Sequence, residues 1–383
     1  MRVLALDPYH GGSYRAFLEG LIAHSRHEWT VLSLPDRFPS WRLQGGAVTL
    51  ARKALALEGD FDVVFASDML NLPLWLALVR NRWGRLPTVL YMHRNPLTPP
   101  LEPSRERAWE LAHIVYTSLL VADAVWFNSR YHHQELLSAL PELLGRFPDF
   151  NHLGELGEIV RKSRVVYPGI PLRQHDRFPD TRHLNDVPVI LWNQRWQYDK
   201  NPDAFWGLIN RLFDAGLKFR LILAGQHFEY QPEGFELAWR RYGDRILHYG
   251  YVEDFAEYSR LLHRSDVILS TARHEFFGVA VWEAVYCGAH PVLPNRLTYP
   301  EILPHRLHRP LLHAPVLYET EEEAFQIVSG MLRGEERPLP RATLQDALRA
   351  FDWSERIREF DTLLEEVASQ RAAVSYEGDM ERL

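Results

Sequence analysis

The chain has 383 residues, of which 46% are hydrophobic and 24% are charged, and its formal net charge is −7. This length is large for one hydrophobic core and predicts two domains. No apolar run approaches the roughly 18 residues of a membrane-spanning helix, and the first residues lack the apolar region of a signal peptide, so we expect a cytoplasmic protein without a membrane partner. The single cysteine, Cys287, excludes an intramolecular disulfide and is expected in the core.

Short apolar runs alternate with helical patterns through the first half of the chain. The expected strands are residues 2–6, 29–34, 63–66, 88–92, 124–127 and 164–166. This alternation predicts an α/β domain with a doubly wound parallel sheet, which we place at residues 1–170.

Two loops that follow strands of this domain carry candidate binding residues. In DPYHGGSYRAF, Gly11 and Gly12 stand at an expected helix start, where main-chain N–H groups can approach an anion or a sugar. An ordinary tight turn is the alternative. His93, in LYMHRNPL, can hydrogen-bond a substrate hydroxyl, and its alternative is a structural histidine.

The same alternation begins again after a polar linker. Its expected strands are residues 189–192, 219–224, 246–249, 267–270 and 290–293, in a second doubly wound domain at residues 186–350. Ligands of such sheets bind beyond the carboxyl ends of the strands, so two such edges facing each other would form a cleft.

Two cations follow the first strand of the second domain. Arg195 and Lys200 lie in the loop before a helix that Asn201 is expected to cap. A guanidinium fork and an ammonium group together suit a diphosphate. The alternative is a surface ion pair with Asp199 or Asp203.

Two glutamates flank the start of a later helix in RHEFFGVAVWEAVYC. The helical spacing predicts a start near Gly278, with Glu275 just before the helix and Glu283 on it. Such a pair can bind an elongated nucleoside diphosphate sugar, with the helix N-terminus toward the diphosphate. The alternative is that both carboxylates are solvated.

No metal site or cofactor is expected. The histidines lack the HExxH spacing, and the Asp60-Phe61-Asp62 pair leads directly into a buried strand. We interpret that acidic pair as polar residues at a strand start.

The motifs together resemble a known family. The segments LDPYHGGSYRAF, YMHRNPL, WFNSRYH, WNQRWQYDKNPDAF, STARHEFFGVAVWEAVYCGAHPVLPNRLTYPEILP and FDWSERIREFDTLL are similar to those of the tRNA-queuosine α-mannosyltransferases, which are retaining enzymes of GT-B fold. The resemblance implies two Rossmann-like domains facing a cleft, with a helix at about 351–366 crossing back to the first. It also implies metal-independent transfer of mannose from GDP-mannose to the cyclopentenediol of queuosine in the anticodon of tRNA-Asp. We prefer front-face substitution for this transfer.

The resemblance also assigns roles to individual residues. Arg195 and Lys200 would bind the diphosphate, Glu275 the donor sugar near the reacting centre, and Glu283 the ribose. Further implied contacts are the main chain of Phe276, Phe277, Gly278 and Val279, the base loop with Tyr251 and Val252, Gly11 and Gly12 near the donor phosphate or the acceptor, and His93 at the sugar.

A tRNA acceptor requires basic or aromatic surface, although the chain as a whole is acidic. The candidates in the first half are Arg80, Arg82, Arg85, Arg161, Lys162 and Arg164, with Trp83, Tyr91 and Trp109 for base stacking. The alternative is that the basic residues form a solvated face and the aromatic residues belong to the core. Three alternatives stay open: a transferase of this fold that uses a GDP- or UDP-sugar and a lipid, metabolite or saccharide acceptor, a nucleotide-sugar epimerase, and a non-catalytic binding protein.

Overall fold

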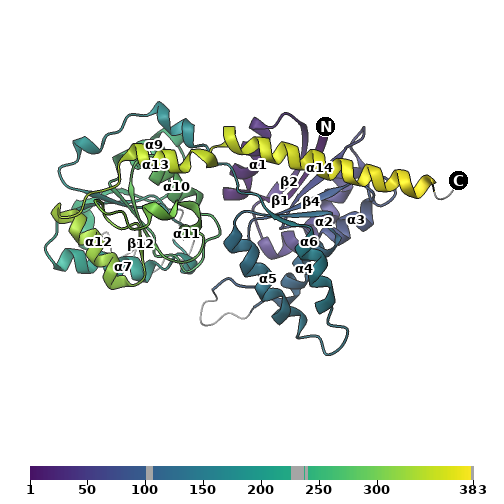
Figure 1. Ribbon diagram of the computed structural model, residues 1–383, viewed down its shortest axis with the longest axis horizontal. Coiled ribbons are helices and arrows are strands. Elements are labelled where there is room, and N and C mark those ends of the chain that lie inside the picture. Colours follow the sequence, from purple (N-terminus) through teal and green to yellow (C-terminus); the bar gives the residue numbers. More distant parts are fainter. Residues whose placement is uncertain (101–106, 226–236, 238–239, 381–383) are drawn as a thin grey trace. The chain divides into compact units, whose positions relative to one another are not determined.

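The chain forms two compact units, each with its own sheet (Figure 1). The computed structural model describes residues 1–100, 107–225, 237 and 240–380. The first unit comprises Met1–Gly169 together with Trp353–Leu383, and the second comprises Ile170–Asp352. Within the described residues, no helix is both long and apolar enough to cross a membrane.

The first unit contains a six-stranded parallel sheet. Its strands are β1 (Arg2–His10), β2 (Glu28–Pro35), β3 (Val63–Ser67), β4 (Thr88–Met92), β5 (Ala124–Phe127) and β6 (Ser163–Val165), in the order β2-β1-β3-β4-β5-β6. All six predicted strands are present, with ends that differ by a few residues because a run of apolar residues marks the buried middle of a strand better than its ends. The predicted doubly wound sheet is therefore confirmed.

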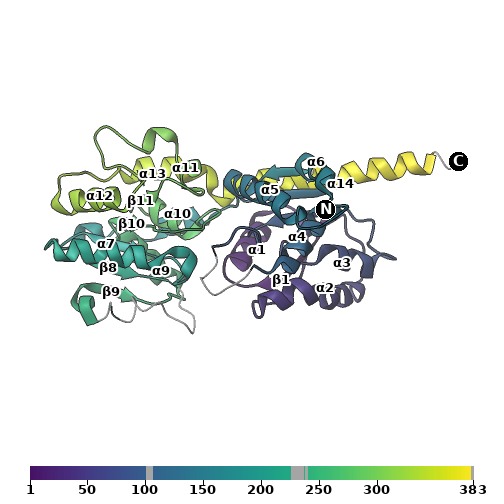
Figure 2. The same ribbon diagram turned by 90° about the horizontal axis from the view of Figure 1, so that it is seen from below.

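Helices cover both faces of this sheet (Figure 2). One face packs against α2 (Pro39–Leu55), α3 (Leu72–Val79), α4 (Trp109–Val121), α5 (Arg130–Leu144) and α6 (Leu156–Arg161), and the other against α1 (Gly12–His24) and α14 (Trp353–Met380). The helix expected at about 351–366 thus begins at Trp353 and continues to Met380.

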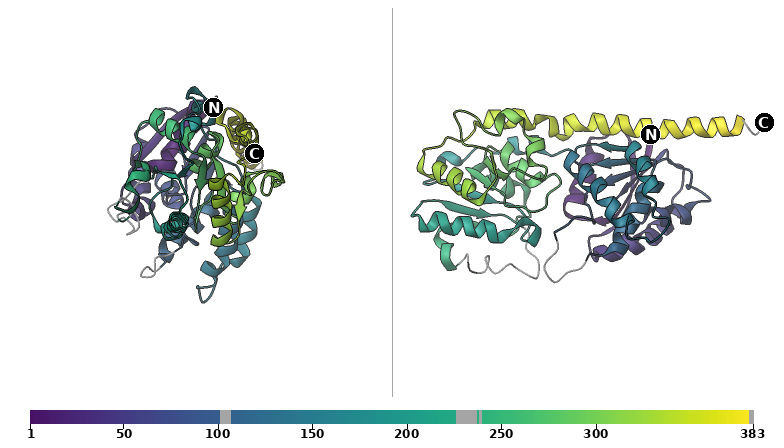
Figure 3. Two further views of the ribbon diagram at one scale, coloured as in Figure 1. Left: turned by 90° about the vertical axis from the view of Figure 1, so that its left-hand side faces the viewer. Right: turned by 60° about the horizontal axis from the view of Figure 1, so that its bottom comes forward.

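Helix α14 lies along the first unit (Figure 3). Close glycine contacts fix its start there. A Cβ on Gly20 would lie 2.3 Å from the ring nitrogen of Trp353, and one on Gly169 would lie 2.1 Å from its Cδ2. Only a residue without a side chain fits at either place. The buried Trp353 and Phe360 rings complete the core on this face.

The second unit contains another six-stranded parallel sheet. Its strands are β7 (Val189–Trp192), β8 (Arg220–Leu223), β9 (Ile246–Tyr249), β10 (Val267–Leu269), β11 (His290–Pro294) and β12 (Leu317–Tyr318), in the order β12-β11-β10-β7-β8-β9. Five strands were predicted from the sequence. The sixth, β12, is only two residues long and gives no periodic signal.

Two layers of helices enclose the second sheet (Figure 2). The helices α7 (Pro202–Asp214) and α12 (Glu321–Arg333) pack together on the core formed by one face. The group α9 (Phe255–Arg264), α10 (Val279–Tyr286) and α13 (Arg341–Leu348) packs together beside it, and the short α11 (Tyr299–Ile302) follows β11.

Each sheet has one position where its strand order reverses. In the first sheet this switch point lies between β1 and β3, and in the second it lies between β7 and β10. In open α/β sheets, ligands bind beyond the carboxyl ends of the strands at this point. The loops after these four strands are therefore where the fold itself favours a binding site.

Candidate functional site

The predicted lysine and the first predicted glutamate meet at the switch point of the second unit. Lys200 ends a 3-10 turn (Tyr198–Lys200) after β7, and Glu275 lies in the loop after β10. The Lys200 Nζ donates to Glu275 Oε2 at 3.0 Å and to the main-chain carbonyl of His274 at 2.8 Å, and it lies 3.2 Å from Asp199 Oδ2. Lys200 is buried, so these acceptors hold its ammonium group in place.

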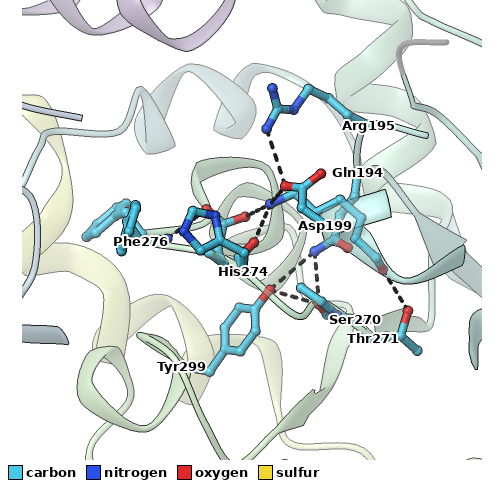
Figure 4. Close-up of polar contacts among 12 residues, drawn as sticks. Gln194, Arg195, Asp199, Ser270, Thr271, His274, Phe276 and Tyr299 are labelled. Atoms are coloured by element: carbon cyan, nitrogen blue, oxygen red, sulfur yellow. Dashed lines mark hydrogen bonds and ion pairs between the residues drawn. The ribbon is translucent and has the colours of Figure 1, made fainter. Parts of the chain in front are cut away.

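Arg195 is the more accessible cation of this cluster (Figure 4). Its guanidinium reaches toward Asp199, with Nη2 at 3.6 Å from Oδ2, and 51% of its side chain is exposed. The alternative ion pair with Asp199 is therefore present, whereas the one with Asp203 is not among the ion pairs of the described residues. The exposed part of the guanidinium is available to an anion.

Asn201 does not cap α7 in the expected way. It precedes the helix with φ +53°, in the left-handed region, and its side chain makes no capping hydrogen bond. Instead, the Thr271 hydroxyl donates to the main-chain carbonyls of Lys200 and Asn201 at 3.0 and 2.9 Å. This contact ties the loop after β7 to the loop after β10 and so fixes Lys200 beside Glu275.

A second set of hydrogen bonds lies next to the cluster of Lys200 and Glu275 (Figure 4). Gln194 Nε2 donates to the hydroxyls of Ser270 and Tyr299 at 2.9 and 3.2 Å, and these two hydroxyls lie 2.8 Å apart. All three residues are buried. These hydrogen bonds thus connect the residues that follow β7 and β10.

The charges of the cluster favour an ionised glutamate beside a neutral histidine. Burial alone would raise the pKa of Glu275, but the cations Lys200 and Arg195 outweigh it and hold that pKa below its usual value. Burial also favours a higher pKa for Asp199, but Lys200 and Arg195 again outweigh it and hold that pKa below its usual value. Burial and the nearby Lys200 lower the pKa of His274 to about 4, so its imidazole is neutral near pH 7.

Gly278 positions the start of α10 next to Glu275. Its φ is +86°, a conformation that L residues rarely adopt, and the helix begins at Val279. The first turn of α10 leaves main-chain N–H groups without intrahelical partners. The predicted helix start is confirmed. The Phe276 N–H, one of the expected main-chain contacts, instead donates to Glu275 Oε1 at 3.1 Å.

The aromatic residues beside this glycine have a structural position. The side chains of Phe276 and Phe277 are buried, and Trp282 Nε1 donates to the Phe277 carbonyl at 2.6 Å. Their rings therefore anchor the loop in the core. Only their main chain lies where a ligand contact is expected.

Glu283 lies on α10 with partners different from those of Glu275. It is 8% exposed, its Oε2 accepts from the Tyr258 hydroxyl at 3.0 Å, and its Oε1 lies 3.9 Å from His175 Nε2. The alternative that both glutamates are solvated is therefore wrong. The two carboxylates are held separately, as binding an elongated ligand at two points requires.

The predicted base loop follows β9. Tyr251 is 60% exposed, whereas Val252 is buried at 9%. Gly250 before them has φ +113°, which turns the chain at the end of the strand. Only Tyr251 of the pair presents a side chain to solvent.

The remaining predicted residues belong to the first unit. Gly12 starts α1 with φ +50°, and a Cβ on it would meet no atom within 4 Å. Gly11 is extended, and a Cβ there would lie 2.0 Å from Asp36 Oδ2. The glycines therefore form a tight turn, as the alternative predicts, and they leave open space at the start of α1.

His93 follows β4 and packs among aromatic rings. Its ring centroid lies 4.3 Å from that of Tyr14 and 4.9 Å from those of Phe17 and Tyr91. Burial, with Arg94 adding to it, lowers the pKa of His93 to about 3, so the imidazole is neutral. Together with Asp7 and others, His93 lines a small pocket at the switch point of this unit.

Several polar residues at this switch point were not predicted. Asp7 Oδ2 lies 2.8 Å from His10 Nδ1, and Asp68 accepts from the Tyr14 hydroxyl at 2.9 Å and from the Arg94 N–H at 2.8 Å. Burial raises the pKa of Asp68 to about 6. Asp7 and Asp68 each follow the apolar run of a predicted strand, and this pattern could have marked them as candidate site residues. Only the strand order shows that β1 and β3 are neighbours.

Two of the three aromatic residues that we suggested for RNA stacking are not available for it. Trp83 is 2% exposed and Tyr91 is fully buried, so neither can stack on a base. Trp109 is half-buried, and Arg146 lies over its ring at 4.1 Å. For Trp83 and Tyr91 the alternative of a core residue is therefore correct, because aromatic residues in apolar runs face the core.

Three of the six basic residues suggested beside them have partners. Arg82 donates to the carbonyls of Leu55 and Gly59 at 3.2 and 3.1 Å. Lys162 lies 3.2 Å from Glu158, and Arg164 lies 3.1 Å from Glu366. Among the described residues, no group of three or more histidine, cysteine, aspartate or glutamate side chains has a geometry that can hold a metal.

Comparison with known families and proteins gives matches over both units. Residues 2–170 match the family described as tRNA-queuosine alpha-mannosyltransferase N-terminal, and residues 174–315 match Glycosyl transferases group 1. A tRNA-queuosine alpha-mannosyltransferase of Drosophila melanogaster is 31% identical over 312 residues, which cover 79% of this chain and 81% of that protein. A GDP-mannose-dependent alpha-(1-6)-phosphatidylinositol dimannoside mannosyltransferase of Mycobacterium tuberculosis is 30% identical over 109 residues, 28% of each chain.

Solved structures share the fold at low identity. Sucrose-phosphate synthase from Thermosynechococcus elongatus has a TM-score of 0.70 at 13% identity, covering 97% of this chain and 100% of that one. Anabaena HepE in complex with UDP and glucose has a TM-score of 0.66 at 16% identity, covering 96% and 100%. At these identities, the likeness shows the fold alone.

Proposed function

The chain belongs to the tRNA-queuosine alpha-mannosyltransferase family and is a mannosyltransferase of GT-B fold, and on that basis we propose that it transfers mannose from GDP-mannose to queuosine in tRNA-Asp. The acceptor hydroxyl belongs to the cyclopentenediol of queuosine. The anomeric configuration of the mannose is retained. The observation that carries this proposal is the Lys200–Glu275 contact at the switch point of the second sheet.

Charge supports a diphosphate leaving group at this place. The transition state of glycosyl transfer places positive charge on the sugar while the departing diphosphate becomes more negative. Arg195 offers an exposed guanidinium, and the N-terminal turn of α10 offers main-chain N–H groups. Lys200 adds a buried cation that two carboxylates and a carbonyl hold in position.

The two glutamates then serve different parts of the donor. Glu275 is ionised and accepts hydrogen bonds from hydroxyls of the mannose, where its negative charge also favours the cationic transition state. Glu283, held by Tyr258, accepts from the ribose hydroxyls. Because Glu283 is bound at the ribose, it cannot act with Glu275 as a glycosidase-type pair across the reacting bond. Front-face substitution, in which a donor phosphate oxygen removes the acceptor proton, fits this division.

Nucleoside mass spectrometry tests the proposal. Queuosine-containing tRNA-Asp is incubated with the protein and GDP-mannose, with queuosine-free tRNA and with UDP-sugars as controls. We expect a hexose on queuosine only in the complete mixture. Donor binding without any hexose on tRNA would contradict the proposed acceptor and favour a lipid, metabolite or saccharide, whereas mannose isomerisation without tRNA would indicate an epimerase.

A further inference from the structure

We infer that Phe38 and Trp41, at the start of α2, form a stacking surface for unpaired bases of the tRNA acceptor. This inference rests on the proposed function, because it places the RNA that the reaction requires. It also replaces the buried residues Trp83 and Tyr91, which cannot contact RNA.

The two side chains are unusually open for aromatic residues of this chain. Phe38 is 72% exposed and Trp41 is 63% exposed. The main-chain N–H of Arg42 donates to the Phe38 carbonyl at 3.0 Å, so one helical turn carries both rings. Exposed rings lose little conformational freedom on binding and offer flat faces on which bases stack.

A glycine supports the exposed tryptophan. A Cβ on Gly45 would lie 2.8 Å from Cζ2 of Trp41, so the indole lies close against the helix at a position without a side chain. This contact limits the motion of the ring while most of its surface stays open. A fixed aromatic ring on the surface of an enzyme is typical of a binding surface.

Charge complements an RNA backbone here although the whole chain is acidic. The segment α2 contains Arg42, Arg52 and Lys53 and no acidic residue, and the exposed Asp36 and Arg37, of opposite charge, precede it. The three basic residues give α2 a formal charge of +3 in a chain whose net charge is −7. The phosphates of an RNA backbone bind to basic side chains, and its bases stack on adjacent aromatic rings.

The surface adjoins the switch point of the first unit. It follows the carboxyl end of β2, which pairs with β1, and the side chain of Asp36 lies against Gly11. An RNA that stacks on Trp41 therefore lies beside the turn of Gly11 and Gly12. A membrane would fit less well, because the apolar residues of α2, such as Leu43 and Leu50, are buried against the sheet.

Binding of tRNA to the full-length protein tests the surface. We expect Trp41→Ala and Phe38→Ala each to weaken the affinity for queuosine-containing tRNA-Asp by about tenfold or more, the effect of losing one stacked base. Trp41→Tyr should restore most of the affinity because it keeps an aromatic ring. The far-UV circular dichroism and the Tm, which report folding of the substituted first unit, and the affinity for GDP-mannose should not change.

The matched control is Phe150→Ala in the same unit. Phe150 resembles Phe38 in exposure, at 87%, and in backbone conformation, with φ +44° against +54°. The control variant should bind tRNA like the unchanged protein. Equal affinity in the Trp41→Ala, Phe38→Ala and Phe150→Ala variants would overturn the stacking surface while leaving the mannosyl transfer intact. Failure of the unchanged protein to bind any tRNA would instead overturn the proposed function.

Discussion

Lys200 and Arg195 illustrate how burial decides the role of two similar charges. Lys200 is buried between carboxylates, whereas half of the Arg195 side chain is exposed. Removing a buried cation leaves its carboxylate partners without compensation. The two residues therefore differ in what they contribute to stability, although both are predicted to bind the same diphosphate.

Replacement by alanine should separate these contributions. Lys200→Ala should abolish transfer and lower the free energy of unfolding by about 3–5 kcal/mol. Arg195→Ala should lower kcat/KM about 10- to 150-fold, the equivalent of about 1.5–3 kcal/mol, with little change in Tm. Steady-state kinetics and thermal unfolding measure both. If Arg195→Ala destabilised the protein as much as Lys200→Ala, the predicted difference between the buried and the exposed cation would be wrong.

Glu275→Gln tests the charge of the glutamate while keeping its size. We expect turnover to fall more than donor affinity, because the carboxylate acts on the cationic transition state. The pKa of Glu275 is lowered in the folded protein, so its charge contributes stability above the usual glutamate pKa of 4.5. This contribution disappears as the pH falls through the folded-state pKa.

Urea unfolding from pH 7 to pH 3 provides the measurement. The unchanged protein should lose its stability advantage over Glu275→Gln below about pH 4.5. If the unchanged protein kept its full stability advantage over Glu275→Gln at pH 3, the lowered pKa of Glu275 would not be the source of that advantage.

At the scale of elements, the turn into α10 sets the distance between the two glutamates. Gly278→Ala should cost about 1–2 kcal/mol because φ is +86° there. It should also displace Glu275, since the added Cβ would lie 3.3 Å from Glu275 Cγ, and transfer should fall at least tenfold.

Gly334→Ala is the control for the backbone effect. Gly334 ends α12 with φ +73°, and a Cβ there meets no atom within 4 Å. This variant should lose similar stability yet retain its kcat/KM. Equal kinetic losses in the two variants would show that general destabilisation, and not the position of Glu275, lowers activity.

At the scale of the whole molecule, the net charge of −7 must be reconciled with an RNA acceptor. Basic side chains near the RNA release counterions on binding, and the chain has such a surface around α2. The affinity for tRNA should therefore fall steeply as salt rises from 50 to 200 mM. Fluorescence anisotropy measures this, and an affinity independent of salt would contradict binding through phosphates.

Sequence alone determined the class of both sheets and the loops that form the proposed donor site. The apolar runs of eleven strands are strong local signals, since most of these strands are buried on both faces and must be apolar throughout. The glycine before α10 and the loop after β7 could also be predicted, because the residues next to them in the sequence indicate both. The resemblance to a family then implied roles for Arg195, Lys200, Glu275 and Glu283, which periodicity does not show.

Tertiary structure alone decided which distant residues meet and which faces are open. Lys200 and Glu275 are 75 positions apart and touch only because β7 and β10 are neighbours. Trp83 and Trp41 are both tryptophans near arginines, yet one is buried and the other exposed. Strand order and burial depend on how the whole chain packs, and a local pattern does not contain that information.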